Sequence, residues 1–412
     1  MSDAHLYADV PWTTEARDIG DWIITEGLRG TNERTLLEGL CERLNSCGVG
    51  LVRAHIARRT LHPIFGAYAC QWRPDEGVKQ LSFDHGKDIQ ENWRQSPFVH
   101  RLENHLHEYH ATLEGTNEPL PFPVLEEMRE RGATEYVGFV VPWGSGDEFG
   151  SLEGYVSSWV TDRSGGFSQD ALDLLRKLLQ PFGLAIKAAG MPKIGGSIAE
   201  TYLGRDAGWR VLRGEIQRGS MEIIDAVLWN CDIRGFTAAA DWMPWNELIT
   251  MLNDYLECIA RPVEDGGGQI LKFMGDGFIA TYDLGQLDEA EVCRAAIGGM
   301  KNVQTALADM NASRASAGQP IFEVDIALHQ GELMYGNIGS RDRLDFTVIG
   351  PAVNEVSRME ALCSELGVPI LISRKFYDLA RSSELETGLK SMGFHELRGV
   401  REPQELITLE DG

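Results

Sequence analysis

Long apolar runs are missing from this sequence. No stretch approaches the roughly 18 to 20 uninterrupted apolar residues that a membrane-spanning helix needs. The first residues, Met1 to Asp9, contain neither a basic region nor an apolar core of the kind found in secretion signals. We therefore expect a protein that neither spans a membrane nor is exported.

Cysteine is scarce, and its spacing gives no sign of pairing. The seven cysteines are odd in number and no two stand in C-x-x-C spacing, which argues against a disulfide framework and a structural zinc site. Free thiols are typical of a reducing compartment, so we expect a cytoplasmic protein. The cysteines are Cys41, Cys47, Cys70, Cys231, Cys258, Cys293 and Cys363.

Positive charge is also in short supply. Lys and Arg number 38 against 62 Asp and Glu, which gives a net charge of -24. Binding to nucleic acid or to an anionic membrane needs a basic face, so we expect the protein to bind neither. A polyanionic substrate would meet an unfavourable field unless metal ions neutralised it. Paired carboxylates that could hold such ions are therefore of special interest.

The chain is long enough for two globular domains. At 412 residues, with 43% hydrophobic and 24% charged residues, it has an ordinary folded composition and exceeds the usual size of one core. Residues 1–190 are predicted to form the first domain. A helix is expected from Thr31 onward, because four leucines between positions 36 and 44 recur at helical spacing.

Strands and a closing helix follow in the same segment. Strand-like runs cover 50–56, 136–141 and 154–160, and Ser168 can cap a helix that Pro181 should kink or end. A helix, several strands and a second helix in this length indicate an α+β sensor module.

The sensor module resembles a GAF-type domain. Thr60-Leu-His-Pro63, followed by Gly66 and Trp72, is similar to that family. Tryptophans in this segment could line a pocket for a small-molecule effector, although such residues are more often part of a core. They stand at positions 72, 93, 143 and 159.

A segment rich in glycine separates the two halves of the chain. The sequence Gly-Met-Pro-Lys-Ile-Gly-Gly-Ser at 190–197 predicts a flexible domain boundary. Residues 191–222 are then a linker or transducer element, and the second domain covers 223–412.

The second domain alternates strands and helices, as an α/β layer sandwich does. Its strands are predicted at 223–231, 269–273, 278–282, 322–328, 333–338 and up to Ile349, with helices at 288–312 and from Ala352. A further helix face holds Trp245, Leu248, Ile249, Leu252, Leu256 and Ile259. Met274-Gly-Asp-Gly277 predicts a hairpin turn whose glycines need positive φ.

Two aspartates stand where strands of this domain end. Asp232 opens the loop 232–237, which leads into a helix and can direct backbone N–H groups at a phosphate. Asp276 lies at the tip of the hairpin. Two carboxylates at neighbouring strand ends can hold two Mg²⁺ or Mn²⁺ ions. Each aspartate alone is equally explained as a cap or turn residue, since Asp is common in turns.

Three longer strings contain these residues and resemble, in order and spacing, successive signatures of the class III adenylate and guanylate cyclases. They are Cys231-Asp-Ile-Arg-Gly-Phe-Thr237, Lys272-Phe-Met-Gly-Asp-Gly277 and Leu344-Asp-Phe-Thr-Val-Ile-Gly-Pro-Ala-Val-Asn-Glu-Val-Ser-Arg-Met-Glu360. The resemblance covers most of residues 223–412. It implies a ferredoxin-like α+β catalytic sandwich preceded by the GAF-like α+β domain.

The resemblance implies a role for each matching residue of the first loop and hairpin. Asp232 and Asp276 match the two metal-binding aspartates, and Ile233 would add its backbone carbonyl as a metal ligand. Gly235, Phe236 and Thr237 complete the loop that would contact the substrate phosphates.

Two more residues match those that read the nucleotide base. Lys272 stands where adenylate cyclases carry a lysine and guanylate cyclases usually carry glutamate. A lysine ammonium donates to adenine N1 but meets the N1–H donor of guanine, so Lys272 favours ATP. Thr347 stands where many relatives have aspartate and one subgroup has threonine, and its hydroxyl discriminates less.

The remaining matches concern the ribose and the phosphates. Asn354 and Arg358 match the pair that positions the ribose and stabilises the pentavalent phosphorane, and their i, i+4 spacing places them on one helix face. Arg398 is the nearest match to a phosphate-contacting basic residue, at a position where lysine is common.

The resemblance thus implies an adenylate cyclase that uses two Mg²⁺ or Mn²⁺ ions per site and works as a homodimer with composite active sites. Bicarbonate is a candidate effector, because the threonine subgroup includes bicarbonate-responsive enzymes. Three alternatives remain. They are a guanylate or mixed-specificity cyclase, a catalytically silent nucleotide-binding regulator, and a two-metal enzyme that makes dinucleotides, whose Gly-Gly-Asp/Glu-Glu-Phe hairpin is absent here.

Overall fold

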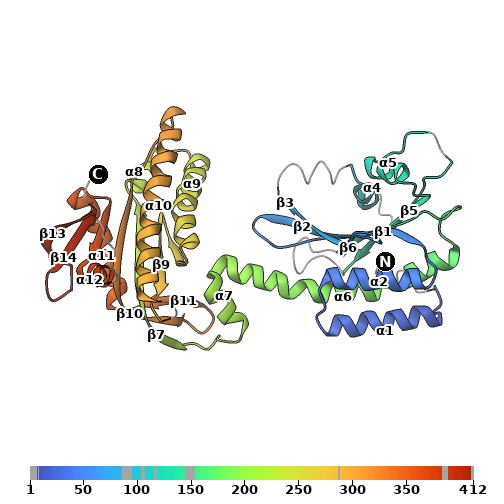
Figure 1. Ribbon diagram of the computed structural model, residues 1–412, viewed down its shortest axis with the longest axis horizontal. Helices are drawn as coiled ribbons and strands as arrows, with labels where there is room; N and C mark the ends of the chain where they lie inside the picture. Colours follow the sequence, from blue (N-terminus) through green and yellow to red (C-terminus); the bar gives the residue numbers. More distant parts are fainter. Residues whose placement is uncertain are drawn as a thin grey trace. The chain divides into compact units, whose positions relative to one another are not determined.

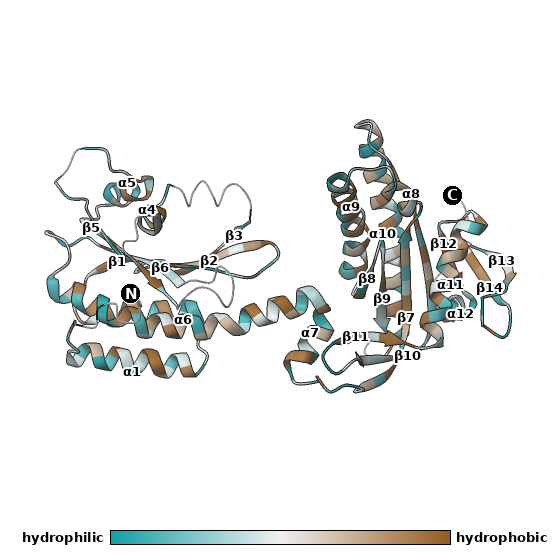
Figure 2. Cartoon of the chain, turned by 180° about the vertical axis from the view of Figure 1, so that it is seen from behind, coloured by the Kyte–Doolittle hydropathy of each residue, from teal (hydrophilic) through white to brown (hydrophobic). Residues whose placement is uncertain are grey.

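The computed structural model divides the chain into two compact units, Met1–Ile198 and Ala199–Gly412 (Figure 1). It describes Tyr7 and residues 9–85, 95–103, 107–115, 118–143, 154–285, 288–382 and 388–409. Figure 2 shows hydrophilic and hydrophobic residues alternating along α1 (Thr14–Leu28) and α6 (Gln169–Leu203), as expected of helices with one buried face.

The first unit is an α+β fold. After α1 its described elements are α2 (Glu33–Ser46), β1 (Leu51–Arg59), β2 (Phe65–Arg73), β3 (Gly77–Asp84), α4 (Pro97–Glu103), β4 (Glu108–Thr112), α5 (Pro123–Glu130), β5 (Glu135–Pro142), β6 (Gly154–Thr161) and α6. In the described part of the unit the strands form one antiparallel sheet in the order β3-β2-β1-β6-β5-β4.

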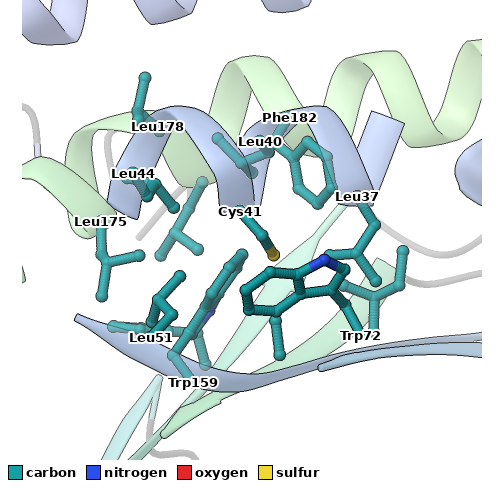
Figure 3. Close-up of a cluster of buried hydrophobic side chains, with 14 of the residues drawn as sticks. Leu37, Leu40, Cys41, Leu44, Leu51, Trp72, Trp159, Leu175, Leu178 and Phe182 are labelled. Carbon is teal, nitrogen blue, oxygen red and sulfur yellow. The ribbon is translucent and has the colours of Figure 1, made fainter. Parts of the chain in front are cut away.

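Helices α2 and α6 pack on one face of this sheet (Figure 3). Asn32 caps α2 by accepting a hydrogen bond from the backbone N–H of Thr35 (3.0 Å), and the predicted leucine face of α2 is buried. Trp72 and Trp159 lie in the same core, 5% and 1% exposed. Each such side chain stabilises the fold by about 1.5–3 kcal/mol through burial. These two tryptophans are therefore core residues.

The other predicted pocket tryptophans differ from this pair. Trp143 packs partly buried against the core, and Trp93 lies outside the described residues. The opposite face of the sheet carries α4 and α5 (Figure 1), with Leu125 and Met128 of α5 buried against Tyr136.

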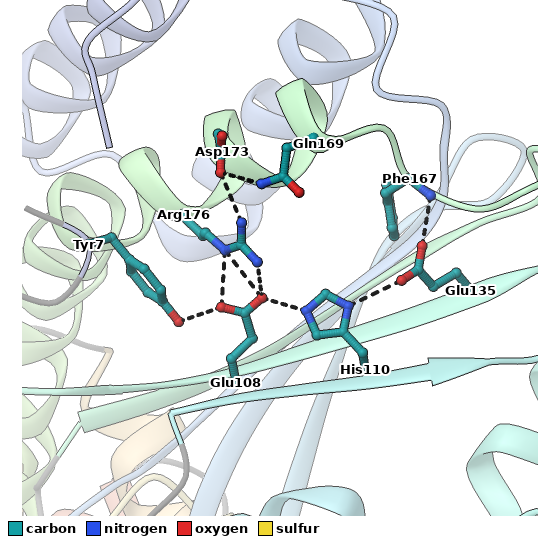
Figure 4. Close-up of polar contacts among 8 residues, drawn as sticks. All are labelled: Tyr7, Glu108, His110, Glu135, Phe167, Gln169, Asp173 and Arg176. Atoms are coloured by element: carbon teal, nitrogen blue, oxygen red, sulfur yellow. Dashed lines mark hydrogen bonds and ion pairs between the residues drawn. The ribbon is translucent and has the colours of Figure 1, made fainter. Parts of the chain in front are cut away.

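A polar network joins the sheet to α6 (Figure 4). The Glu108 carboxylate accepts hydrogen bonds from Arg176 (Nη2–Oε1, 2.6 Å), from the Tyr7 hydroxyl (2.8 Å) and from His110. Burial raises the pKa of Glu108, but the hydrogen bonds from His110 and Arg176 outweigh it and bring the pKa to about 2. Glu135 accepts from His110 as well. The carboxylates of this network are matched by cations and donors, so it holds the fold together.

Helix α6 runs without interruption through the segment predicted to be a flexible boundary. Pro181 and Pro192 both lie inside it, although a proline within a helix costs about 3 kcal/mol. Tertiary contact offsets this, because Gly190 lies against the guanidinium of Arg58 and a Cβ there would be 2.8 Å from Cζ. The prediction of a flexible 190–197 is therefore wrong, and the helix does not end at Pro181.

The second unit is a mixed α+β fold. After α7 (Arg205–Leu212) its described elements are β7 (Met221–Ile233), α8 (Phe236–Ala240), α9 (Trp245–Asp265), β8 (Gln269–Met274), β9 (Gly277–Asp283), α10 (Glu289–Ser316), β10 (Val324–Gly339), β11 (Leu344–Ile349), α11 (Pro351–Leu366), β12 (Ile370–Ser373), α12 (Arg374–Ser382), β13 (Leu389–His395) and β14 (Gln404–Leu409). The sheet order is β13-β14-β12-β10-β7-β9-β8, with β11 on β10. Strands β10-β7-β9-β8 are antiparallel neighbours in the order of a ferredoxin-like β-α-β-β-α-β unit, as predicted.

Both faces of this sheet are covered. Helices α9 and α10 pack on the face that contains Trp229 and Cys231, whereas α11 packs on the face that contains Leu228. Side chains alternate along a strand, so Asp232 points to the side of α11.

Strand β10 is longer than expected. The two predicted strands at 322–328 and 333–338 are parts of this single strand, which pairs with β7 from Val324 to Gly336. Position 331 inside this strand is a glycine, and a Cβ there would lie only 2.8 Å from the Cβ of Ala352. The prediction of two strands is therefore wrong.

Helix α9 buries a face that differs from the predicted one. Met251 and Tyr255 are buried, whereas Trp245 is 76% and Ile249 52% exposed. Apolar periodicity alone does not separate a core stripe from an exposed apolar surface, so the predicted face is partly wrong.

The segment before β7 makes fixed contacts within its unit. Arg210 of α7 lies 5.3 Å from the ring centroid of Tyr335 and pairs with Glu222 (2.6 Å). The Asn337 side chain donates to the carbonyl of Glu215 (2.7 Å). The connecting element is thus anchored to β10. Among the described helices none is long and apolar enough to span a membrane.

Candidate active site

Asp232 and Asp276 come together beside the end of β7. Asp232 is the last residue but one of β7, and Asp276 lies in the turn between β8 and β9, where Phe278 pairs with Cys231. Burial and the neighbouring Asp276 carboxylate raise the pKa of Asp232 to about 7, and burial raises the pKa of Asp276. Without a cation, the pair therefore holds a proton near neutral pH.

The approach of the two strands depends on Gly277. A Cβ at this position would lie 1.9 Å from the carbonyl oxygen of Cys231. Gly277 is not among the glycines with positive φ, whereas Gly275 has φ 68°. The expectation that both glycines of the turn need positive φ is therefore wrong for Gly277, which is required for close packing instead.

Other polar residues surround the aspartate pair. Glu360 of α11 lies near Asp232, and burial together with the Asp232 carboxylate raises the pKa of Glu360 to about 7. The side-chain amide of Asn230 donates a hydrogen bond to Glu360 (3.4 Å). Asp325 lies opposite Asp232 in the β7–β10 register. The Arg234 guanidinium is engaged by Asp325 (Nε–Oδ2, 3.2 Å).

The donor atoms of this cluster fit a hard divalent cation. Carboxylate and backbone carbonyl oxygens are the ligands that Mg²⁺ and Mn²⁺ take. Burial raises both pKa values, the neighbouring carboxylate adds to the rise at Asp232, and a bound cation would favour the charged form of both groups. In the described ranges no group of three or more His, Cys, Asp or Glu side chains forms a complete metal site. Asp232, Asp276 and the carbonyl of Ile233 would therefore need substrate oxygens or water to complete the coordination.

The predicted phosphate loop leads directly into a short helix. Gly235 adopts φ 83° and forms the N-cap of α8, whose first residues are Phe236 and Thr237. The first backbone N–H groups of a helix have no partners within it, so the loop can offer donors to an anion next to Asp232.

Lys272 of β8 is joined to β11, the strand that contains Thr347, by a residue that the sequence did not single out, although β8 and β11 are not paired in the sheet. The Lys272 ammonium binds the Asp345 carboxylate at 2.5 Å, and this hydrogen bond lowers the pKa of Asp345. Asp345 is two residues before Thr347 on β11, so both point to the same side of the strand. The two partners of the ion pair are 46% and 50% exposed, which leaves them accessible to a ligand.

Asn354 and Arg358 lie on α11, one turn apart, as predicted. Asn354 is exposed and Arg358 is half-buried. Across the described ranges Arg358 has no hydrogen bond or ion pair. Gly399 lies beside Arg358, since a Cβ on Gly399 would be 3.7 Å from Nη1 and Nη2 of Arg358. The exposed Arg398 directly precedes Gly399 and therefore belongs to the loop next to Arg358.

The predicted site residues thus form three groups within one chain. The first is the aspartate pair with its loop, the second is Lys272 with Thr347, and the third is Asn354 and Arg358 near Arg398. Among the residues described, no hydrogen bond or ion pair links one group to another.

Sequence reasoning missed Asp325, Asp345 and Glu360. A lone aspartate inside the apolar run at 324–328 was the available sign for Asp325. The available sign for Asp345 was its position two residues before Thr347, on the same face of the strand. Glu360 ends the third string but carried no assigned role, and only packing of α11 on β7 brings it to Asp232.

Comparison with known proteins gives matches in the second unit. Residues 223–410 match the family described as "Adenylate and Guanylate cyclase catalytic domain". A protein of Anabaena cylindrica named adenylate cyclase is 40% identical over 147 residues, 35% of this chain and 28% of that protein. Adenylate cyclase 1 of Rhizobium meliloti is 28% identical over 145 residues, 34% of this chain and 21% of that protein. The chain therefore matches less than a third of the length of these curated relatives.

Two solved structures each cover a little under half of the chain. The adenylyl cyclase CyaB from P. aeruginosa is 23% identical with a TM-score of 0.42, covering 47% of this chain and 97% of that one. A bacterial light-regulated adenylyl cyclase is 24% identical with a TM-score of 0.40, covering 46% of this chain and 91% of that one.

Proposed function

We propose that the protein is an adenylate cyclase, which converts ATP to 3′,5′-cyclic AMP and pyrophosphate, because residues 223–410 match the family of adenylate and guanylate cyclase catalytic domains. The observation that carries the proposal is the Asp232–Asp276 pair, held by the contact of Gly277 with β7. The relatives from Anabaena and Rhizobium that are named adenylate cyclase support ATP as the substrate.

In this reaction the ribose 3′-oxygen attacks the α-phosphorus in line. The new O3′–P bond forms, the bond from the α-phosphorus to the bridging oxygen breaks, and pyrophosphate leaves while the 3′-hydroxyl gives up its proton. Two Mg²⁺ or Mn²⁺ ions, held by Asp232, Asp276 and the Ile233 carbonyl, would neutralise phosphate charge and acidify the 3′-hydroxyl. Asn354 would orient the ribose.

Arg358 is suited to the negative charge that grows on the phosphorane. It is half-buried and has no counter-ion among the residues described, so its guanidinium is available to the transition state. A preorganised donor of this kind is worth about 10²- to 10³-fold in rate. Arg398, in the loop beside it, would contact the leaving phosphates.

Base selection is proposed to rest on Lys272. Its ammonium can donate to adenine N1, while the Asp345 carboxylate that holds it can accept from an exocyclic amino group. Guanine presents an N1–H donor to the same ammonium, which leaves a donor facing a donor. Thr347 would add a hydroxyl that can donate to adenine or guanine or accept from either base.

The active unit is proposed to be a homodimer with composite sites. The three residue groups are unconnected within one chain, which suits a site completed by a second copy. Exposed apolar side chains stand directly beside two of the groups. Phe273 and Met274 follow Lys272 and are 52% and 45% exposed, and Ile349 follows Thr347 by two residues at 41%.

Regulation is proposed to come from the first unit. Its α+β architecture suits a GAF-like sensor of a small molecule, and α6 connects it covalently to the second unit. Bicarbonate is the second candidate effector. Cyclic AMP output that ignores bicarbonate at constant pH would remove it from consideration.

Product analysis tests the proposed function directly. The full chain is incubated with ATP or GTP and Mn²⁺, and the products are identified by mass spectrometry. We expect cyclic AMP from ATP at a higher kcat/KM than cyclic GMP from GTP. A reversed preference would establish a guanylate cyclase, and the absence of both products would support a silent nucleotide-binding regulator.

A further inference from the structure

The face of the first sheet opposite α2 and α6 contains a buried arginine. Arg53 of β1 is 6% exposed. Its Nε and Nη2 donate to Oε1 of Gln71 (3.2 and 2.9 Å), and its Nη1 donates to Oγ of Ser158 (3.2 Å). Phe98 of α4 stacks on the neighbouring His55, with ring centroids 6.3 Å apart. Every guanidinium nitrogen is thus hydrogen-bonded, but only to neutral partners.

Arg53 differs in this respect from other buried or half-buried arginines of the unit. Arg58 pairs with Glu33, and Arg176 pairs with Glu108 (Figure 4). Within the described ranges no carboxylate lies within ion-pair distance of Arg53. Neutral acceptors satisfy its hydrogen bonds but leave its charge uncompensated.

The surroundings add positive charge to this face. Arg73 and Arg131 are close enough to act on the charge of Arg53, and they share a single carboxylate. That carboxylate is Glu127, which lies 3.9 Å from Arg73 and 3.2 Å from Arg131 and is 52% exposed. Burial and Arg53 lower the pKa of His55 to about 3, so His55 stays neutral. Three guanidinium groups therefore face one exposed carboxylate, in a chain whose net charge is -24.

An uncompensated buried guanidinium is unfavourable. Moving an ion out of water costs several kcal/mol even after the protein relaxes, and neutral hydrogen bonds recover only part of it. A chain so rich in acidic residues could supply a counter-ion, as it does for Arg58 and Arg176. The partner that would complete the site is an anion from solution.

We propose that the sheet face around Arg53 is a binding site for a small oxyanion, a carboxylate or phosphate group. The planar fork of an arginine matches such groups, and Gln71 and Ser158 hold the fork in place. Gln71 and His55 both retain some exposed surface, so solvent reaches residues next to the guanidinium. The site lies in the unit that contains no cyclase residues, and the proposal does not depend on the proposed function.

Isothermal titration calorimetry on the full chain tests the site, with inorganic phosphate and acetate as separate probes at constant ionic strength. Gln71→Glu is the central variant, because it places a carboxylate of nearly the same shape where Arg53 already donates two hydrogen bonds. Arg53→Met removes the charge altogether. Arg29→Met is the matched control, since Arg29 is 69% exposed and pairs with Glu26.

We expect saturable binding of at least one probe by the wild type and by Arg29→Met. Binding should weaken by about tenfold or more in Gln71→Glu and in Arg53→Met. Gln71→Glu should melt no lower than the wild type, because it gives Arg53 a counter-ion, so its loss of binding would not reflect unfolding. Which probe binds distinguishes a phosphate site from a carboxylate site. Failure of both probes to bind, or unchanged binding by Gln71→Glu, would overturn the proposal.

Discussion

Replacing Gly277 by alanine is expected to separate the aspartate pair. The alanine Cβ would lie 1.9 Å from the carbonyl oxygen of Cys231 and 3.0 Å from the Cα of Asp232. Both are backbone atoms, so no side-chain rotation relieves the contact. Because a Cβ is essentially never found within 3.0 Å of another heavy atom, β9 and β7 must move apart by roughly 1 Å. Such a shift costs about 100-fold in rate and about 1–3 kcal/mol in stability.

The matched control is Gly275→Ala in the same turn. Gly275 has φ 68° and open space around its missing side chain, so alanine there strains the backbone by about 1–2 kcal/mol without forcing the strands apart. Initial rates of cyclic AMP formation with ATP and Mn²⁺ are compared for the two variants, with thermal melting followed by circular dichroism. If both variants lose stability alike and Gly277→Ala keeps the rate of Gly275→Ala, the close approach of β7 does not position the aspartates.

Four further predictions concern the same domain. Asp232→Ala and Arg358→Ala chains should each be inactive alone but recover activity when mixed, and proven heterodimers without activity would contradict composite sites. Lys272→Ala should lower kcat/KM for ATP by about 10- to 100-fold, the loss of a charged hydrogen bond. Asp345→Asn should reduce the preference for ATP over GTP while changing the free energy of unfolding by less than about 1 kcal/mol, as measured by urea titration. In the native chain without metal, Asp232 has a pKa of about 7, whereas the ordinary pKa of an aspartate, which applies to the unfolded chain, is 3.8. Between these two pH values the native chain therefore binds a proton that the unfolded chain has released. The stabilisation from this proton is lost as pH rises toward 7. A divalent ion replaces the proton, so the rise in Tm caused by Mn²⁺ should be larger at pH 8 than at pH 6, and Asp232→Asn should abolish the difference.

The positions of the key aspartates were predictable because local rules fix them. An apolar run followed by Asp232, and an Asp-Gly turn between two short strands, place both residues at strand ends without reference to the rest of the chain. The neighbours of the pair were not predictable in this way. Asp325 and Glu360 are 93 and 128 positions away from Asp232, and the pairing of β10 and the packing of α11 bring them near.

The course of α6 shows a second limit of local rules. Glycine at 190 and proline at 192 ordinarily mark a break in a helix. Here Gly190 is small so that the helix can lie on the Arg58 guanidinium, and Lys193 reaches Glu33 at 3.6 Å. The same residue type therefore serves close approach rather than a turn, as Gly277 does in the second unit. Sequence alone does not distinguish these two uses of glycine, because the partner of each contact comes from a distant segment.

Unsatisfied charge of both signs connects the candidate site residues with their proposed ligand. Burial and neighbouring carboxylates raise the pKa values of Asp232 and Glu360 to about 7, so negative charge is poorly compensated at the end of β7. Arg358 is half-buried without a counter-ion in the described part of the chain, which is excess positive charge on α11. A single salt bridge between the two would satisfy both, yet none forms among the residues that the structure describes. A metal–triphosphate complex presents cations to the carboxylates and anionic oxygens to the arginine, so one ligand satisfies both demands, which a bare nucleoside or a free metal ion does not.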